Sequence, residues 1–123
     1  MEQLASLFFH SRTQAHIFHL GVKGPGAYAA HKALEGYYEE IVDLIDGLVE
    51  SYQGKNGLIK FQPVNSIDNN CDIKNIISYF EKLCVALEKL RKDSKLQDSW
   101  IQNEIDNIAT LLYSTKYKLV NLG

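Results

Sequence analysis

Histidines and carboxylates recur at helical spacing in the first half of this 123-residue chain. His31 and Glu35 are four positions apart, as are Asp46 and Glu50, so each pair lies one turn apart on a helix and can reach one ion. His19 lies at the border of an apolar stripe on the preceding segment, where an imidazole can face an ion between helices. A carboxylate-rich site with one or two imidazoles suits iron, manganese or zinc. We therefore predict a metal site built from these five side chains.

A single chain cannot bring all five of these side chains to one metal ion. Asp46 follows His31 by 15 positions, roughly 22 Å along a helix, so the two residues cannot bind the same ion. If two copies of this helix lie antiparallel about a two-fold axis, His19, His31 and Glu35 of one chain meet Asp46 and Glu50 of the other, and two equivalent sites form. The spacing thus predicts a homodimer at least. A polar helix interface without metal is the alternative interpretation, and the spacing alone leaves both open.

Four helices are expected to position these residues. Apolar residues recur at helical spacing over residues 3–22, 27–52 and 72–92, and again from Ser99 onward, where Ser99 and Gln102 have capping-box spacing. Strand-type alternation is not evident, so we expect an all-α fold. The side chains expected to form the core are Leu4, Leu7, Phe8, Ser11, Ala15, Phe18, Val22, Leu34, Tyr38, Ile41, Ile45, Leu48, Ile73, Ile76, Ile77, Phe80, Leu83, Cys84, Leu87, Leu90, Ile101, Ile105, Ile108, Leu112 and Leu119.

The two connections that can be read from the sequence differ in length. The Gly-Pro-Gly sequence at 24–26 ends the first helix and permits a tight reversal, so the second helix should lie antiparallel to the first. Residues 54–70 are rich in turn-forming residues and long enough to cross the bundle, with Leu58, Ile59 and Phe61 expected to hold them in place. We expect one domain, residues 1–123, with four helices and a long crossover between the second and the third.

Composition narrows the class of protein. The net charge is −2 and no basic tail or patch is evident, so direct DNA binding is not expected. No apolar run approaches ~18 residues and no secretory signal is recognisable, so we expect a cytoplasmic protein that does not span a membrane. Cys71 and Cys84 lack the spacing of a metal site, and both are expected to be reduced thiols.

The same residues resemble a known family, the Dps proteins, which are mini-ferritins of the ferritin-like superfamily. The family signature is a histidine near the end of the first helix, a Val-Lys-Gly-Pro type of turn, His-x3-Asp, a tyrosine, and Asp-x3-Glu. The close match covers the stretch from His19 to Glu50, and the four-helix layout extends the resemblance loosely over the rest of the chain. In this sequence the signature is formed by His19, residues 22–25, His31 and Glu35, Tyr38, and Asp46 and Glu50.

The resemblance implies a ferritin-like bundle with a ferroxidase centre between two-fold-related subunits. Members of the family typically form hollow dodecamers, oxidise Fe(II), usually with hydrogen peroxide, and store the ferric mineral. Iron is therefore the expected metal, with zinc or manganese as other candidates. The five residues are expected to act both as metal ligands and in catalysis, with Tyr38 as a neighbour of the metal or a redox-active group.

The chain departs from the family pattern at several positions. Glu35 replaces the usual Asp, Leu20 replaces a tryptophan, Ser51 replaces an arginine, and the N-terminal segment lacks a lysine-rich tail. The dodecamer is therefore an open question, and a structural or assembly protein on the same fold, with an empty or differently metallated site, is the alternative function. A third possible class is a bundle that binds a small molecule or nucleic acid. The sequence shows no basic stripe or aromatic platform to support it.

Overall fold

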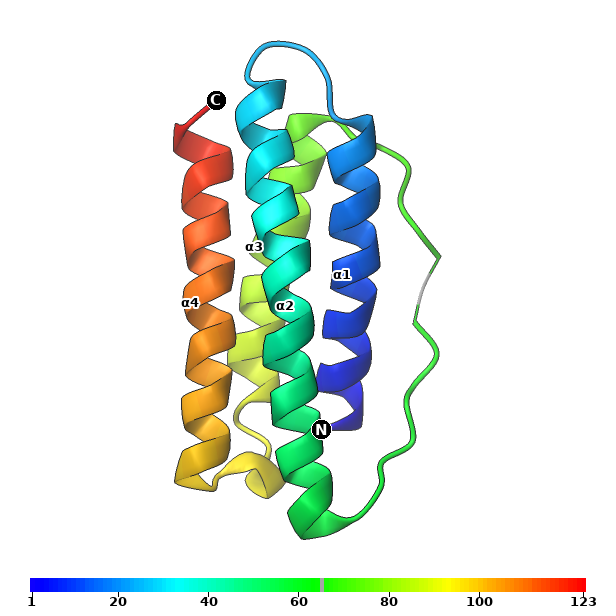
Figure 1. The fold of residues 1–123 in the computed structure, drawn as a ribbon, viewed down its shortest axis with the longest axis vertical. Helices are drawn as coiled ribbons and strands as arrows, with labels where there is room; N and C mark the ends of the chain where they lie inside the picture. Colours follow the sequence, from blue (N-terminus) through cyan, green and yellow to red (C-terminus); the bar gives the residue numbers. More distant parts are fainter. Residues whose placement is uncertain (65) are drawn as a thin grey trace.

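The computed structural model describes residues 1–64 and 66–123, and within them the chain forms four long helices and no strand (Figure 1). The prediction of an all-α four-helix chain is confirmed. The second helix extends one turn beyond its predicted end, and the other boundaries agree within two residues. The helices are α1 (Glu2–Gly21), α2 (Ala27–Asn56), α3 (Ile73–Leu90) and α4 (Ser99–Asn121), with a short 3-10 helix η1 (Ser94–Leu96) before α4.

The turn between α1 and α2 is tight, as predicted. The backbone N–H of Val22 bonds to the carbonyl of Phe18 at 2.9 Å, and the chain then reverses through Gly24 and Gly26, whose φ angles are 96° and 81°. Only glycine adopts this left-handed conformation at little cost. The reversal sets α2 antiparallel to α1, so that the end of α1 faces the start of α2 (Figure 1).

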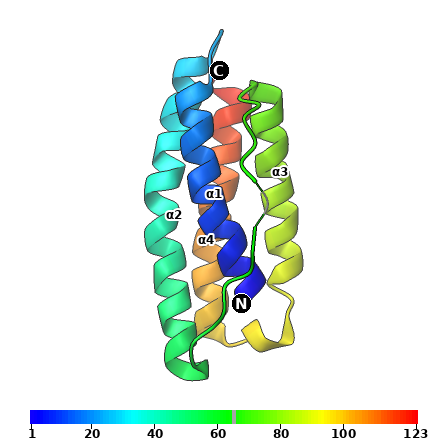
Figure 2. The same cartoon turned by 90° about the vertical axis from the view of Figure 1, so that its right-hand side faces the viewer.

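The connection between α2 and α3 crosses the whole length of the bundle. It leaves the lower end of α2 in Figure 1, rises along the outside of α1 and α3, and enters α3 at the opposite end (Figures 1 and 2). As a result α3 runs parallel to α2, and the predicted crossover is confirmed. α1 packs on α2, α2 on α4 and α4 on α3, whereas α1 and α3 make much less contact.

Hydrogen bonds to α1 hold this crossover in place. The amide of Gln62 donates to the Ser6 hydroxyl at 2.7 Å, and the buried side chain of Gln14 exchanges two hydrogen bonds of 2.8 Å with the backbone of Asp68. The expectation that Leu58 holds the segment is wrong, because 89% of this residue is exposed.

The other two apolar residues expected to hold the crossover do contact the bundle. Ile59 packs against the core, and Phe61 makes an edge contact with Phe9 at a centroid distance of 5.7 Å. Phe61 is nevertheless half exposed, so the segment is held to α1 chiefly through polar contacts.

Most residues of the predicted stripes are buried in the core, and the partly buried ones pack against it: Leu7, Val22, Tyr38, Ile73, Ile77 and Leu90. Tyr37, and not Tyr38, is fully buried; Tyr38 is only half-buried. The Tyr37 hydroxyl lies 2.6 Å from the Ser11 hydroxyl, which in turn donates to the carbonyl of Phe8 at 2.7 Å. A phenol can be buried when its polar end has a partner, and Ser11 provides one. Burial raises the pKa of Tyr37 far above its ordinary value.

The predicted capping box at the start of α4 is also wrong. Asp98 is the N-cap residue, and no side chain caps the helix. Gln102 instead donates to the carbonyls of Leu96 and Arg91 at 2.8 and 3.0 Å, because η1 places those acceptors beside it. Cys71 and Cys84 are free, as expected, and Cys84 lies in the core. None of the described helices has the length and apolar character needed to cross a membrane.

Candidate metal site on α1 and α2

Four aromatic side chains meet where α1 ends and α2 begins. The rings of His19 and His31 are stacked, with centroids 3.6 Å apart and planes 17° apart. His16 stacks on Tyr38 at 4.2 Å, and the edge of Tyr38 meets His19 at 5.3 Å. The structure therefore brings together the two histidines that the sequence placed at the site, and it adds His16.

The two stacked histidines each bond to the backbone of the other. Nδ1 of His19 lies 2.7 Å from the carbonyl oxygen of His31, and Nδ1 of His31 lies 2.8 Å from the carbonyl oxygen of His19. A carbonyl can only accept, so each Nδ1 must carry the hydrogen. In the neutral rings, both Nε2 atoms then carry a lone pair.

The His31 contact also has a structural role. The carbonyl of His19 belongs to the last turn of α1, where carbonyls have no partner within the helix. Nδ1 of His31 satisfies it and so joins the start of α2 to the end of α1. Only 7% of His19 is exposed, while His31 is half-buried. This arrangement fixes the orientation of both rings whether or not an ion is bound.

Glu35 lies one turn further along α2 and is paired with a lysine. Its carboxylate accepts a hydrogen bond from Nζ of Lys32 at 3.3 Å. The hydrogen bond and the charge of Glu35 raise the pKa of Lys32. A partly exposed ion pair of this kind contributes little stability, so a cation can displace the lysine at small cost. The sequence signal for this pair is its i, i+3 spacing on one helix.

Tyr38 stays protonated at neutral pH. The pKa of its phenol is raised, first by partial burial and then by the negative charges of Glu35 and Glu39. A neutral hydroxyl beside the two histidines can donate a hydrogen bond to a group bound there.

Asp46 and Glu50 are exposed and lie near the other end of α2. The helix is unbroken between His31 and Asp46, so the roughly 22 Å expected from the spacing applies. Within the described part of one chain, no three His, Cys, Asp or Glu side chains are placed to hold a metal ion. One chain therefore places His31 with Glu35 and Asp46 with Glu50 at two separate positions along α2.

The surface around these residues has apolar patches. Val42 is half-buried and Val49 is buried, and both lie on the edge of α2 that carries Glu35 and Asp46. Leu20 on the last turn of α1 is an exposed large apolar side chain. The candidate site thus has both charged and apolar surface available to a partner.

Comparisons with known proteins identify one family. The chain matches the model of the family of unknown function DUF5856 over residues 24–119. His31, Glu35, Asp46 and Glu50 lie inside the matched range, whereas His19 precedes it. No curated protein and no solved structure matches the chain. The chain belongs to the family DUF5856.

Proposed function

We propose that this protein is a ferroxidase of the Dps type, on a ferritin-like bundle, that oxidises Fe(II) with hydrogen peroxide between two-fold-related subunits. The observation that carries the proposal is the reciprocal bonding of His19 and His31. Metal-binding histidines commonly donate one ring N–H to a carbonyl, which fixes the tautomer and leaves the other nitrogen for the metal. Both rings here are fixed in that way, with Nε2 free.

The topology and the charge distribution support the same function. A four-helix bundle with one long crossover is the arrangement of ferritin-like folds. The separation of His31 from Asp46 on one straight helix requires a second copy of α2 to complete each site. Val42 is half-buried beside that edge and provides apolar area for the contact, so a homo-oligomer is part of the proposal, while its subunit number is not.

Each residue has a role in the proposed chemistry. Nε2 of His19 and of His31 would bind Fe(II), for which imidazole is a suitable ligand. Glu35 of the same subunit, with Asp46 and Glu50 of the second copy, would bind through hard oxygen ligands that favour the Fe(III) product.

The electrons balance when two ions react with one peroxide. Each Fe(II) gives one electron, the O–O bond breaks, and two protons from solvent complete two waters beside two Fe(III). The paired transfer avoids releasing a hydroxyl radical. Manganese or zinc would fit the same ligands, but zinc has no redox chemistry and would only occupy the site.

The test is an anaerobic Fe(II) titration followed by peroxide, with ferric absorbance and particle mass measured on the same sample. We expect rapid, saturable oxidation by a dimer or larger symmetric assembly. Asp46→Ala should reduce the rate to that of buffer while helical content is unchanged. Glu40→Ala is the matched control, because Glu40 is exposed on the same helix but lies about 120° around it from Asp46. Equal rates in wild type and Asp46→Ala would contradict the proposal.

A structural or assembly protein is the second candidate, and two contacts favour it. His31 satisfies the end of α1, and Glu35 is paired with Lys32, so both side chains have partners without a metal. In that case the wild type would oxidise iron no faster than buffer, whereas His31→Ala would still lower stability. The two candidate functions are therefore separated by one rate measurement on the wild-type protein.

A further inference from the structure

The seam between α1 and α3 contains cavities that neither the core nor the histidine site uses. One of about 340 Å³ lies between the two helices, with Leu7 on α1, Pro63 and Val64 on the crossover, and Ala86 and Leu90 on α3 among its walls. Its exposed surface is mostly apolar. A volume of this size is in the usual range for small-molecule sites.

A second cavity of about 430 Å³ lies on the other side of the crossover. Its walls include Phe9 and His10 of α1 and Phe61 and Val64 of the crossover. Ser6, Gln62 and Val64 line both cavities, so the two adjoin across one short stretch of chain. We call residues 57–64 the strap and the two cavities together the strap groove.

The strap groove exists because α1 and α3 diverge beneath the crossover. Phe18 and Tyr79 meet edge to face at 5.5 Å and the Tyr79 hydroxyl lies 3.4 Å from Nδ1 of His10, but the two helices make little other contact. The strap bonds to α1 through Ser6, and among the described residues it forms no hydrogen bond with α3. It can therefore move away from α3 without losing a hydrogen bond. Figure 2 shows this single extended segment passing between the two helices.

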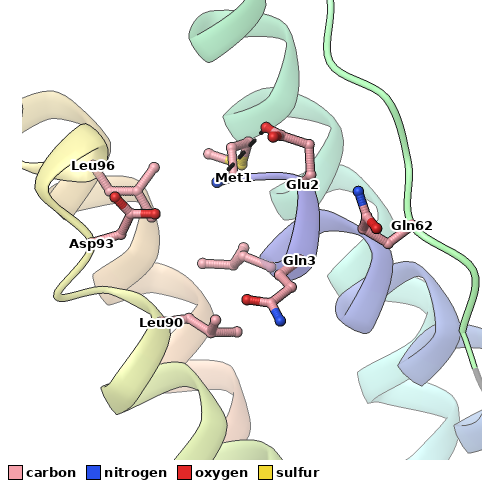
Figure 3. A pocket seen from close by; sticks show the side chains of 8 residues that line it. Met1, Glu2, Gln3, Gln62, Leu90, Asp93 and Leu96 are labelled. Carbon is pink, nitrogen blue, oxygen red and sulfur yellow. Dashed lines mark ion pairs between the residues drawn. The ribbon is translucent and has the colours of Figure 1, made fainter.

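The charged residues near the groove favour one orientation of a bound anionic ligand. Lys89 lines the first of these two cavities, and it is exposed with no ion pair among the described residues. A third cavity of about 290 Å³ adjoins the lower end and is lined by Glu2 and Asp93 (Figure 3). The N-terminal ammonium of Met1 lies 4.0 Å from the Glu2 carboxylate in this third cavity, and Asp93 is the carboxylate left over. An anionic group is therefore favoured at Lys89 over the Asp93 side, and an apolar tail would extend toward Phe9.

We propose that the strap groove binds a single-chain anionic amphiphile, a monomeric fatty acid. Its carboxylate pairs with Lys89, and its alkyl chain lies under the strap against Leu7, Val64 and Phe9. Both cavities are open to solvent, so a flexible chain can enter beside the strap, and their volumes of about 340 and 430 Å³ suit a small ligand. This inference does not depend on iron or on oligomer formation.

Calorimetry with octanoate, decanoate and dodecanoate, each below its micelle concentration, tests the proposal on the full chain. Each two-carbon extension should tighten Kd, by up to about fourfold per methylene if the added group is fully buried. Dodecyltrimethylammonium should bind more weakly than dodecanoate. Equal or tighter binding of the cation, or no binding of any carboxylate below micelle formation, would overturn the assignment.

Matched variants locate the ligand. Ala86→Trp fills the first cavity and should reduce dodecanoate affinity at least tenfold, whereas Val85→Trp should not, because Val85 is 70% exposed and outside the cavity. Lys89→Glu should weaken dodecanoate, and Lys82→Glu, on the same helix but outside the groove, should not. Circular dichroism verifies that each variant is folded. Dodecanoate binding that is unchanged in folded Ala86→Trp would contradict the proposal.

Discussion

α1 meets two helices in two different ways. Against α2 it is joined by a short turn, and the seam is closed by stacked rings and by hydrogen bonds of 2.7 and 2.8 Å between His19 and His31. Against α3 it is separated by the crossover, and the seam is bridged by one extended segment. The comparison teaches that the tight turn holds α1 against α2, whereas α1 and α3 are not consecutive in the chain and the strap only partly fills the space between them.

The largest expected effect comes from removing the imidazole that closes the α1–α2 seam. His31→Ala should lower the peroxide-driven iron oxidation rate by more than about tenfold, because a proposed ligand is lost. It should also cost about 1–2 kcal/mol of unfolding free energy, because the carbonyl of His19 loses its partner. Stopped-flow absorbance and urea denaturation measure the two effects. A loss of stability with an unchanged oxidation rate would assign His31 a structural role alone.

The next effect concerns the place where the crossover returns to α1. A Cβ added at Gly21 would lie 2.4 Å from Sγ of Cys71, far inside contact distance. Gly21→Ala should therefore push the crossover away and cost about 1–3 kcal/mol. Gly36→Ala is the control, because nothing lies within 4 Å of a Cβ there, and it should stabilise the protein by about 0.5–1 kcal/mol.

Denaturation with urea measures both glycine variants. If Gly21→Ala is destabilised for the reason given, adding Cys71→Ala should recover much of the loss. A double variant no more stable than Gly21→Ala would show that the steric explanation is wrong.

Much of the fold was predictable from the sequence, because apolar periodicity and the Gly-Pro-Gly turn are local signals. The crossover followed from the length and composition of its segment. Which of Tyr37 and Tyr38 is buried could not be predicted from the sequence, because both positions border the same apolar stripe. The outcome depends on Ser11, a residue of another helix that pairs with the Tyr37 hydroxyl. The false capping box has a similar cause, since η1 provides Gln102 with acceptors that spacing cannot reveal.

The candidate site was predictable only in part. Helical spacing placed His31 with Glu35 and separated both from Asp46, and the unbroken α2 agrees with that separation. The exchange of Nδ1 contacts between His19 and His31 was not predictable, because it depends on the angle at which two helices meet. Whether the five residues bind iron stays a prediction, because Asp46 and Glu50 lie too far along α2 to join His31 within one chain.

A smaller effect is expected at the strap. Ser6→Ala removes the acceptor of the Gln62 amide and should cost about 1 kcal/mol. Ser114→Ala is the control, because Ser114 is exposed on α4 and has no hydrogen bond among the described residues. Hydrogen exchange at the Gln62 amide should accelerate in Ser6→Ala alone. Unchanged exchange would mean that the strap is held by its apolar contacts, and the contrast between the two seams of α1 would be weaker than argued above.

The smallest effect is a dependence on pH at the upper end of the crossover. The side-chain hydrogen bond from Asn75 and then the backbone hydrogen bond from Asn70 hold the pKa of Asp68 below its ordinary value. A carboxyl whose pKa is lower in the folded state contributes stability that is fully present above its unfolded pKa, about 3.9, and is lost as pH falls through the folded value. The wild type should therefore lose slightly more stability than Asp68→Asn between about pH 5 and pH 2, measured as urea midpoints. If stability falls equally with pH in the two proteins, this carboxylate does not hold the crossover. The upper end of the crossover would then depend on the hydrogen bonds between Gln14 and the Asp68 backbone, which the substitution leaves in place.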